Sequence, residues 1–108
     1  APYGRAAWEV LQRPEFAEGA ARKLVRAANV AQAYQHRYTG AVDLALVARA
    51  LAPSQGVGIP ADWHSPIEQD AILLERAKDN AAAGDYLAFL RSGEIQTLIT
   101  DAGYLRCQ

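Results

Sequence analysis

The sequence predicts an α/β fold, in which short apolar strands alternate with helices. Residues 30–38 carry apolar side chains at helical spacing and follow a residue that can cap a helix. Residues 23–28 precede this helix as an expected strand. Residues 43–48 follow it as a short run in which apolar and polar side chains do not alternate regularly, which is typical of a strand covered on both faces. A strand, a helix and a strand in succession indicate an α/β unit.

The first predicted element is a helix over residues 4–13. Its apolar side chains recur on one helical face: Tyr3, Ala7, Val10 and Leu11. Pro14 ends this pattern, because its ring does not fit into a helix interior. Residues 15–22 are then expected to be a short helical or irregular connector that leads into the first strand.

The predicted helix at residues 30–38 has a well-specified start. Asn29 stands at the N-cap and Gln32 at the third helical position, which is a capping-box arrangement. We expect the Asn29 side chain to accept a hydrogen bond from a first-turn N–H while Gln32 reaches back. Gly40 follows the helix, where a left-handed residue ends it.

The C-terminal half begins with a connecting segment at residues 53–66, which contains three prolines and two glycines. Residues 70–75 are predicted to form another strand. Asn80 and Ser92 then precede two apolar helical patterns as N-caps, and Gly103 ends the second helix. The predicted order is therefore helix, strand, helix, strand, linker, strand, helix, helix.

The composition excludes several classes of protein. The chain has 108 residues, of which 51% are hydrophobic, so it is expected to form one small globular domain at most. No apolar run approaches the length of a membrane span. Eleven basic and twelve acidic residues give a net charge of −1, so nucleic acid is not an expected partner. The single cysteine, Cys107, excludes an internal disulfide. The chain starts at Ala1 and contains no Met, so we expect it to be part of a longer polypeptide.

The sequence offers little for catalysis. His36 and His64 are not spaced with a second metal ligand, and no cation site or cofactor is expected. No serine lies in a Gly-x-Ser-x-Gly turn. The pair Gly56 and Gly58 does not follow a strand and open a helix, as a phosphate-binding loop requires. An enzyme is therefore disfavoured.

Helix amino ends offer a different kind of site, because their unpaired N–H groups and positive dipole ends attract anions. Two such ends have short opening turns, at Pro2-Tyr3-Gly4 and at Asn29-Val30. The signal is weak by itself, since every helix has an amino end.

Six motifs occur in a fixed order and spacing, within residues 1–7, 29–32, 39–48, 59–62, 66–74 and 88–104. Together they resemble the periplasmic molybdate-binding proteins of bacterial ABC importers. The resemblance implies a three-layer α/β lobe of a type II periplasmic binding protein, with the N-terminal lobe missing. Residues 1–65 would be the second-lobe core with half of the anion site. Residues 66–108 would be the return (hinge) strand and C-terminal helices that pack on the first lobe.

The resemblance also implies site residues. The backbone N–H groups of Tyr3 and Val30 would hold the molybdate or tungstate oxyanion, with Asn29 and Ala48 as secondary candidates. Some members add a tyrosine hydroxyl at the position of Ala48, so this chain resembles the subgroup without that contact. Arg49 departs from the family pattern, and we expect it at the surface.

The implied function is solute binding in the periplasm, without catalysis, and delivery of the oxyanion to the membrane permease of an ABC importer. The alternative is a ligand-sensing domain of a transcription regulator with the same clamp fold, which a helix-turn-helix upstream would favour. An enzyme on this fold is a further alternative. The truncated chain is expected to bind ligand weakly, and to self-associate or swap strands through unpaired edges.

Overall fold

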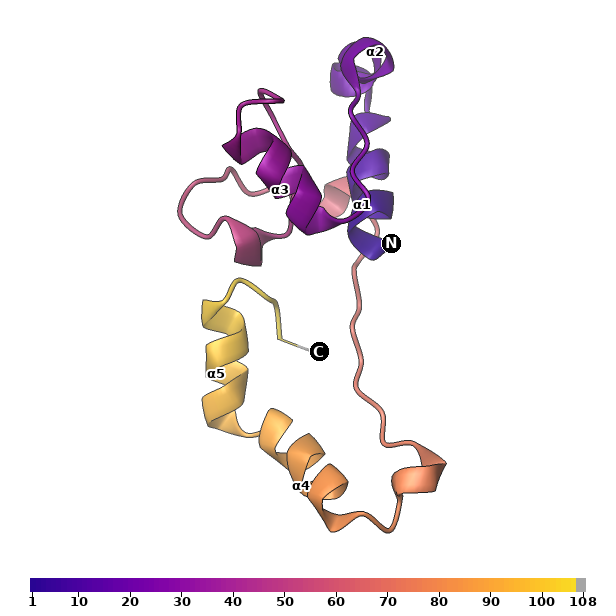
Figure 1. The fold of residues 1–108 in the computed structure, drawn as a ribbon, viewed down its shortest axis with the longest axis vertical. Coiled ribbons are helices and arrows are strands. Elements are labelled where there is room, and N and C mark those ends of the chain that lie inside the picture. Colours follow the sequence, from indigo (N-terminus) through magenta and orange to yellow (C-terminus); the bar gives the residue numbers. More distant parts are fainter. Residues whose placement is uncertain (107–108) are drawn as a thin grey trace. The chain divides into compact units, whose positions relative to one another are not determined.

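The computed structural model describes residues 1–106, so Cys107 lies outside the described residues, and the side chains of residues 20–22 are also left undescribed. The chain divides into two compact units, Ala1–Ile67 and Glu68–Gln108. The helices of the first unit are α1 (Pro2–Leu11), α2 (Pro14–Lys23), α3 (Val30–Tyr38), η1 (Arg49–Leu51) and η2 (Ala61–Trp63) (Figure 1). Those of the second unit are η3 (Glu75–Ala77), α4 (Ala81–Leu90) and α5 (Gly93–Asp101).

The predicted α/β class is wrong for this chain, because residues 1–106 contain helices and no strand. The three-layer α/β lobe is therefore not formed. Residues 24–28, 44–48 and 68–74 are drawn without arrows in Figure 1. Leu24 and Ala48 do have extended backbone, with ψ angles of 122° and 138°. An extended segment becomes a strand only when a second one hydrogen-bonds to it, and the described residues provide no such ladder.

Two prolines set the start of the first two helices. α1 begins at Pro2, two residues before the predicted start, because proline suits the first helical position. Pro14 lies beyond the end of α1 at Leu11, and it also opens α2. Residues 15–22 are therefore helical.

The predicted caps of the remaining α-helices are confirmed. The Asn80 side chain accepts a hydrogen bond from the Ala82 N–H at 3.1 Å, and Ser92 Oγ accepts one from Ile95 at 3.4 Å. Gly103 follows the C-cap of α5 with a φ of 98°, a left-handed conformation that favours glycine. Gly40 has a φ of 78° after α3.

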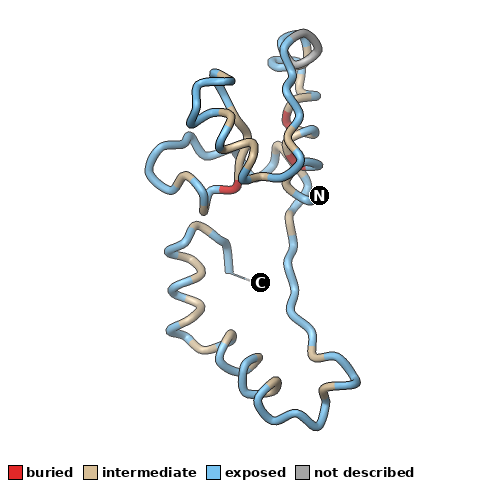
Figure 2. Tube along the Cα trace, in the orientation of Figure 1, coloured by how far each residue is buried: buried red, intermediate tan, exposed pale blue. Residues whose placement is uncertain are grey.

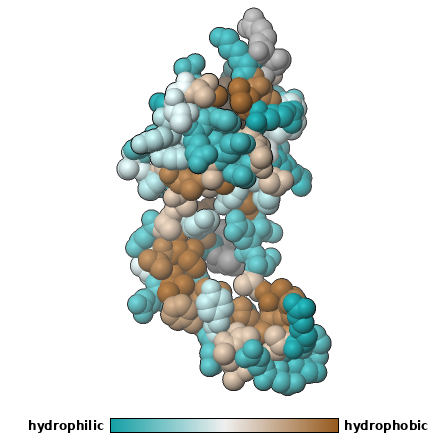
Figure 3. All heavy atoms as spheres, viewed as in Figure 1, coloured by the Kyte–Doolittle hydropathy of each residue, from teal (hydrophilic) through white to brown (hydrophobic). Residues whose placement is uncertain are grey.

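The buried side chains of the described residues all lie in the first unit. They are Ala6 and Val10 of α1, together with Ala48 (red in Figure 2). α1 packs against α2, and the Phe16 and Trp63 rings lie 5.9 Å apart. The second unit has hydrophobic side chains at its surface (Figure 3), including Ile72, Tyr86, Phe89 and Leu98. The first unit therefore contains the core that positions the candidate site.

Candidate functional site

The opening turn of α3 is held by two side-chain hydrogen bonds. Asn29 Oδ1 accepts from the Gln32 N–H at 2.9 Å, as predicted. Gln32 Oε1 accepts from the Ala28 N–H at 2.6 Å, so it reaches one residue further back than a standard capping box. Among the described residues, the N–H groups of Val30 and Ala31 have no acceptor. This turn therefore presents two N–H donors at the positive end of a helix dipole.

The opening turn of α1 lacks a capping side chain. Tyr3 is the second residue of this helix, and its side chain is half-buried. Ala1 stands at the N-cap, where its methyl group has no hydrogen-bond acceptor. A Cβ atom built on Gly4 meets nothing within 4 Å, so the backbone there is open to the approach of another group.

A cation–π contact joins the segment before α3 to α1. The Arg26 guanidinium carbon lies 5.1 Å from the centre of the Trp8 ring. Figure 1 shows the chain between α2 and α3 descending toward α1 before α3 begins. Both predicted donor turns therefore belong to the same packed unit.

Ala48 contributes a buried methyl group and no side-chain donor. Its side chain is 7% exposed, and its carbonyl accepts a hydrogen bond from the Leu51 N–H at 3.0 Å. Arg49 follows as the first residue of η1 and is exposed, as predicted. If Ala48 serves a ligand, it does so through its backbone.

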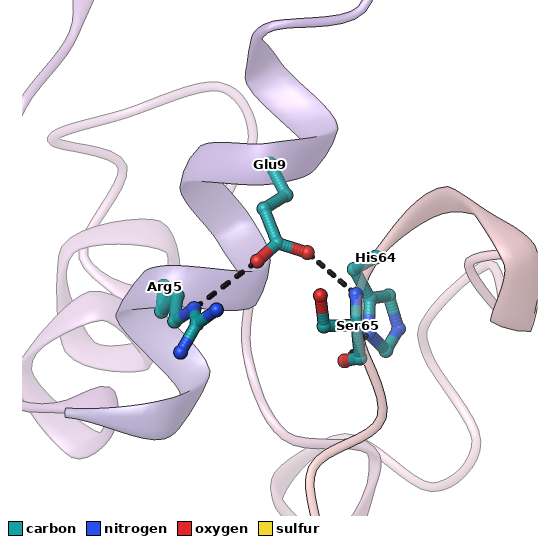
Figure 4. A network of polar contacts seen from close by, with 4 residues as sticks. All are labelled: Arg5, Glu9, His64 and Ser65. Atoms are coloured by element: carbon teal, nitrogen blue, oxygen red, sulfur yellow. Dashed lines mark hydrogen bonds and ion pairs between the residues drawn. The ribbon is translucent and has the colours of Figure 1, made fainter.

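A polar network on α1 was not predicted from the sequence (Figure 4). Glu9 Oε2 accepts a hydrogen bond from the Ser65 N–H at 2.5 Å, and Glu9 Oε1 lies 3.3 Å from Arg5 Nε. His64 Nδ1 lies 2.8 Å from the Ser65 carbonyl oxygen. The i, i+4 spacing of Arg5 and Glu9 is a local pattern from which their ion pair could have been predicted. Ser65 is 56 residues from Glu9 in the sequence, so no local pattern indicates their hydrogen bond. The network ties the end of the linker to α1.

The Glu9 carboxylate should make the stability of the first unit depend on acid pH. The Ser65 N–H holds the pKa of Glu9 below its ordinary value of 4.5, against the opposing effect of burial and with help from Arg5. A lowered folded-state pKa stabilises the fold above about pH 4.5, and this stabilisation is lost as pH falls through the folded pKa. We expect Glu9→Gln to reduce the drop in thermal midpoint between pH 6 and pH 3. An equal drop in thermal midpoint in the parent and in Glu9→Gln would contradict this role of Glu9.

The Asn29 cap should stabilise the first unit measurably. Asn29→Ala removes the acceptor for the Gln32 N–H, so we expect the free energy of unfolding to fall by about 1 kcal/mol. Urea unfolding followed by tryptophan fluorescence measures it, since Trp8 and Trp63 both lie in the first unit. Asn29→Asp retains an acceptor and serves as the control. An unchanged stability in Asn29→Ala would show that the bond contributes nothing.

The described residues contain no group of three or more His, Cys, Asp or Glu side chains that could hold a metal ion. Across residues 1–106, each helix is too short or too polar to cross a bilayer.

The chain is similar to known proteins over nearly its whole length. The profile of a family described as "Bacterial extracellular solute-binding protein" matches residues 1–105. The chain is 37% identical over 111 residues to the molybdate-binding protein ModA of Azotobacter vinelandii, covering 96% of this chain and 44% of that protein. It is 38% identical over 109 residues to ModA of Rhodobacter capsulatus, covering 97% and 43%. The chain thus spans less than half the length of these relatives. No solved structure matches it significantly.

Proposed function

Because the chain belongs to the family of bacterial extracellular solute-binding proteins, we propose that it is part of a protein that captures molybdate for an ABC importer. The observation that carries this proposal is the similarity to two molybdate-binding proteins over nearly the whole chain. Neither the family description nor these relatives favour a transcription regulator. The proposal concerns the whole protein, since the relatives are more than twice as long as the matched region.

The proposed contacts are backbone N–H groups at the opening turns of two helices. Tyr3 in α1 and Val30 in α3 would donate to oxygen atoms of the oxyanion. Asn29 Oδ1 is engaged with the Gln32 N–H, so the side-chain NH₂ of Asn29 is the group that could add a contact. The Ala48 N–H, which has no acceptor among the described residues, is the other secondary candidate.

This donor set supports binding of an anion without catalysis. Neutral dipoles can replace the hydration shell of a dianion, and hydrogen bonds to a charged acceptor are stronger than those between neutral groups. Selection would rest on the size of the ion, because donors spaced for molybdate or tungstate would hold the smaller sulfate at poorer distances. The proposal requires neither a cation nor a cofactor.

The proposed place of action is the periplasm, and the proposed partner is the membrane permease of the importer. Both extend the family description, which concerns extracellular solute binding.

Titration calorimetry of the full-length protein tests the proposal. We expect molybdate or tungstate to bind much more tightly than sulfate. The 108-residue chain should bind weakly or not at all, because it would hold only part of the donors. Absent molybdate affinity, or equal affinity for sulfate, would overturn the function. Tight binding by the isolated 108-residue chain would contradict the proposal that the donors are shared between this chain and the rest of the full-length protein.

A further inference from the structure

The segment between α2 and α3 leads to the opening turn of α3 without backbone pairing to α1. Among the described residues, no backbone hydrogen bond joins residues 24–27 to α1. Burial contributes little here, because Leu24 and Val25 are 39% and 56% exposed. The position of this segment against α1 therefore depends on side-chain contacts at the surface.

Arg26 makes such a contact with a ring of α1. Its guanidinium carbon lies 5.1 Å from the centre of the Trp8 ring, which is within the range of a cation–π attraction. Arg26 is exposed, and no carboxylate among the described residues pairs with it. Trp8 is 45% exposed, so its ring is available to this partner rather than enclosed by the core. The contact therefore holds the segment against α1.

The two partners of this contact are connected to the two proposed donors. Arg26 lies four residues before Val30, and the two hydrogen bonds of the capping turn fix the chain as it enters α3. Trp8 lies in the same helix as Tyr3. The contact thus links the element that carries one donor to the element that carries the other.

We propose that Arg26 and Trp8 are positioning residues, whose cation–π contact sets the spacing between the Tyr3 and Val30 N–H groups. Neither side chain touches the oxyanion in this proposal. When the contact is broken, the two opening turns shift relative to one another, and the donors are correctly spaced for only part of the time. The inference rests on the proposed function, and it places the control of the size of the site outside the site itself.

Titration calorimetry of the full-length protein with molybdate tests the contact. Arg26→Gln removes the cation, and Trp8→Leu removes the ring. We expect each to raise the molybdate Kd about three- to fivefold, equivalent to about 0.7–1 kcal/mol, because a contact shifts an equilibrium by no more than its own strength. Arg26→Lys retains a cation for the ring, so its Kd should stay within about twofold of the parent value. A loss in Arg26→Lys as large as in Arg26→Gln overturns the proposal.

The double variant separates positioning from direct attraction of the anion by the Arg26 charge. If the charge acted alone, Arg26→Gln would raise the Kd by the same factor with or without the Trp8 ring, and the two effects would multiply. Both changes break the same contact in the proposal. We therefore expect Trp8→Leu/Arg26→Gln to have a Kd within about twofold of the weaker single variant. Effects that multiply overturn the proposal.

Selection between ions gives a second readout, which a general loss of stability would not change. A smaller folded fraction lowers the affinity for every ion by the same factor, whereas freer spacing lets the donors close on the smaller sulfate. We expect the ratio of the sulfate Kd to the molybdate Kd to fall at least about twofold in Arg26→Gln. A ratio equal to that of the parent overturns the proposal.

Arg13 provides a matched control in the same unit. Its guanidinium carbon lies 4.3 Å from the centre of the Trp63 ring, in a cation–π contact that does not involve residues 24–28. Arg13→Gln also removes one positive charge, and it should leave the molybdate Kd within about twofold of the parent value. Equal losses in Arg13→Gln and Arg26→Gln overturn the positioning role. A parent protein without molybdate affinity overturns the proposed function and this inference with it, whereas a parent that binds and an Arg26→Gln variant with the same Kd overturn the inference alone.

Discussion

Val30→Pro is expected to weaken molybdate binding by the full-length protein about ten- to a hundredfold while α3 stays folded. The substitution deletes the N–H that we propose as a ligand donor, and a hydrogen bond to a charged group contributes about 1.5–3 kcal/mol. Proline fits the first position of a helix, as Pro2 and Pro14 show in α1 and α2. The preceding Asn29 has φ −156° and ψ 171°, the extended conformation that a following proline requires.

The chain contains a matched control for this substitution. Ala81 is the first residue of α4 and follows an asparagine cap, Asn80, with φ −90° and ψ 101°. Ala81→Pro should leave molybdate affinity unchanged by calorimetry. Val30→Ala shortens the side chain but retains the N–H, so its affinity should stay within about threefold of the parent. Full affinity in Val30→Pro, or an equal loss in Val30→Ala, would remove the Val30 N–H from the site.

Val10→Ala is expected to lower the free energy of unfolding of the first unit by about 2 kcal/mol. Val10 is 3% exposed and lies in the small core where α1 packs. The substitution removes two buried carbon groups, each contributing about 0.8 kcal/mol, and leaves a small cavity. Urea unfolding followed by tryptophan fluorescence gives the value, because both tryptophans lie in the first unit.

The same substitution at an exposed position provides the comparison. Val57 belongs to the linker, and Val57→Ala should change stability by less than about 0.5 kcal/mol. If the two variants lost the same amount, Val10 would not be part of a core whose packing stabilises the unit.

The helix caps could be predicted from the sequence because their partners are close along the chain. Asn29 lies three residues before Gln32, and Asn80 lies two residues before Ala82. Pro14 was harder to interpret, since proline is disfavoured inside a helix but favoured at its first position. Only the packed structure determines that a second helix begins there.

The strands could not be predicted correctly, because an apolar run shows that a segment is suited to pairing but not that a partner is present. Residues 43–48 and 70–75 both satisfy the pattern, but among the described residues neither run pairs with a second extended segment, and Glu75 begins η3 instead. The placement of Tyr3 and Val30 in opening turns followed from local signals. The bond between Glu9 and Ser65 depends on long-range packing, for which no local pattern exists.

The concentration of buried side chains in the first unit has a consequence for local opening. None of the described residues of the second unit is buried, and α4 and α5 have ten and nine residues. Helices of this length are marginal in water unless an apolar face is covered. In the 108-residue chain, amide protons of α4 and α5 will therefore exchange with deuterium through frequent fraying. Those of α1 around Val10 will be retained until the first unit opens as a whole.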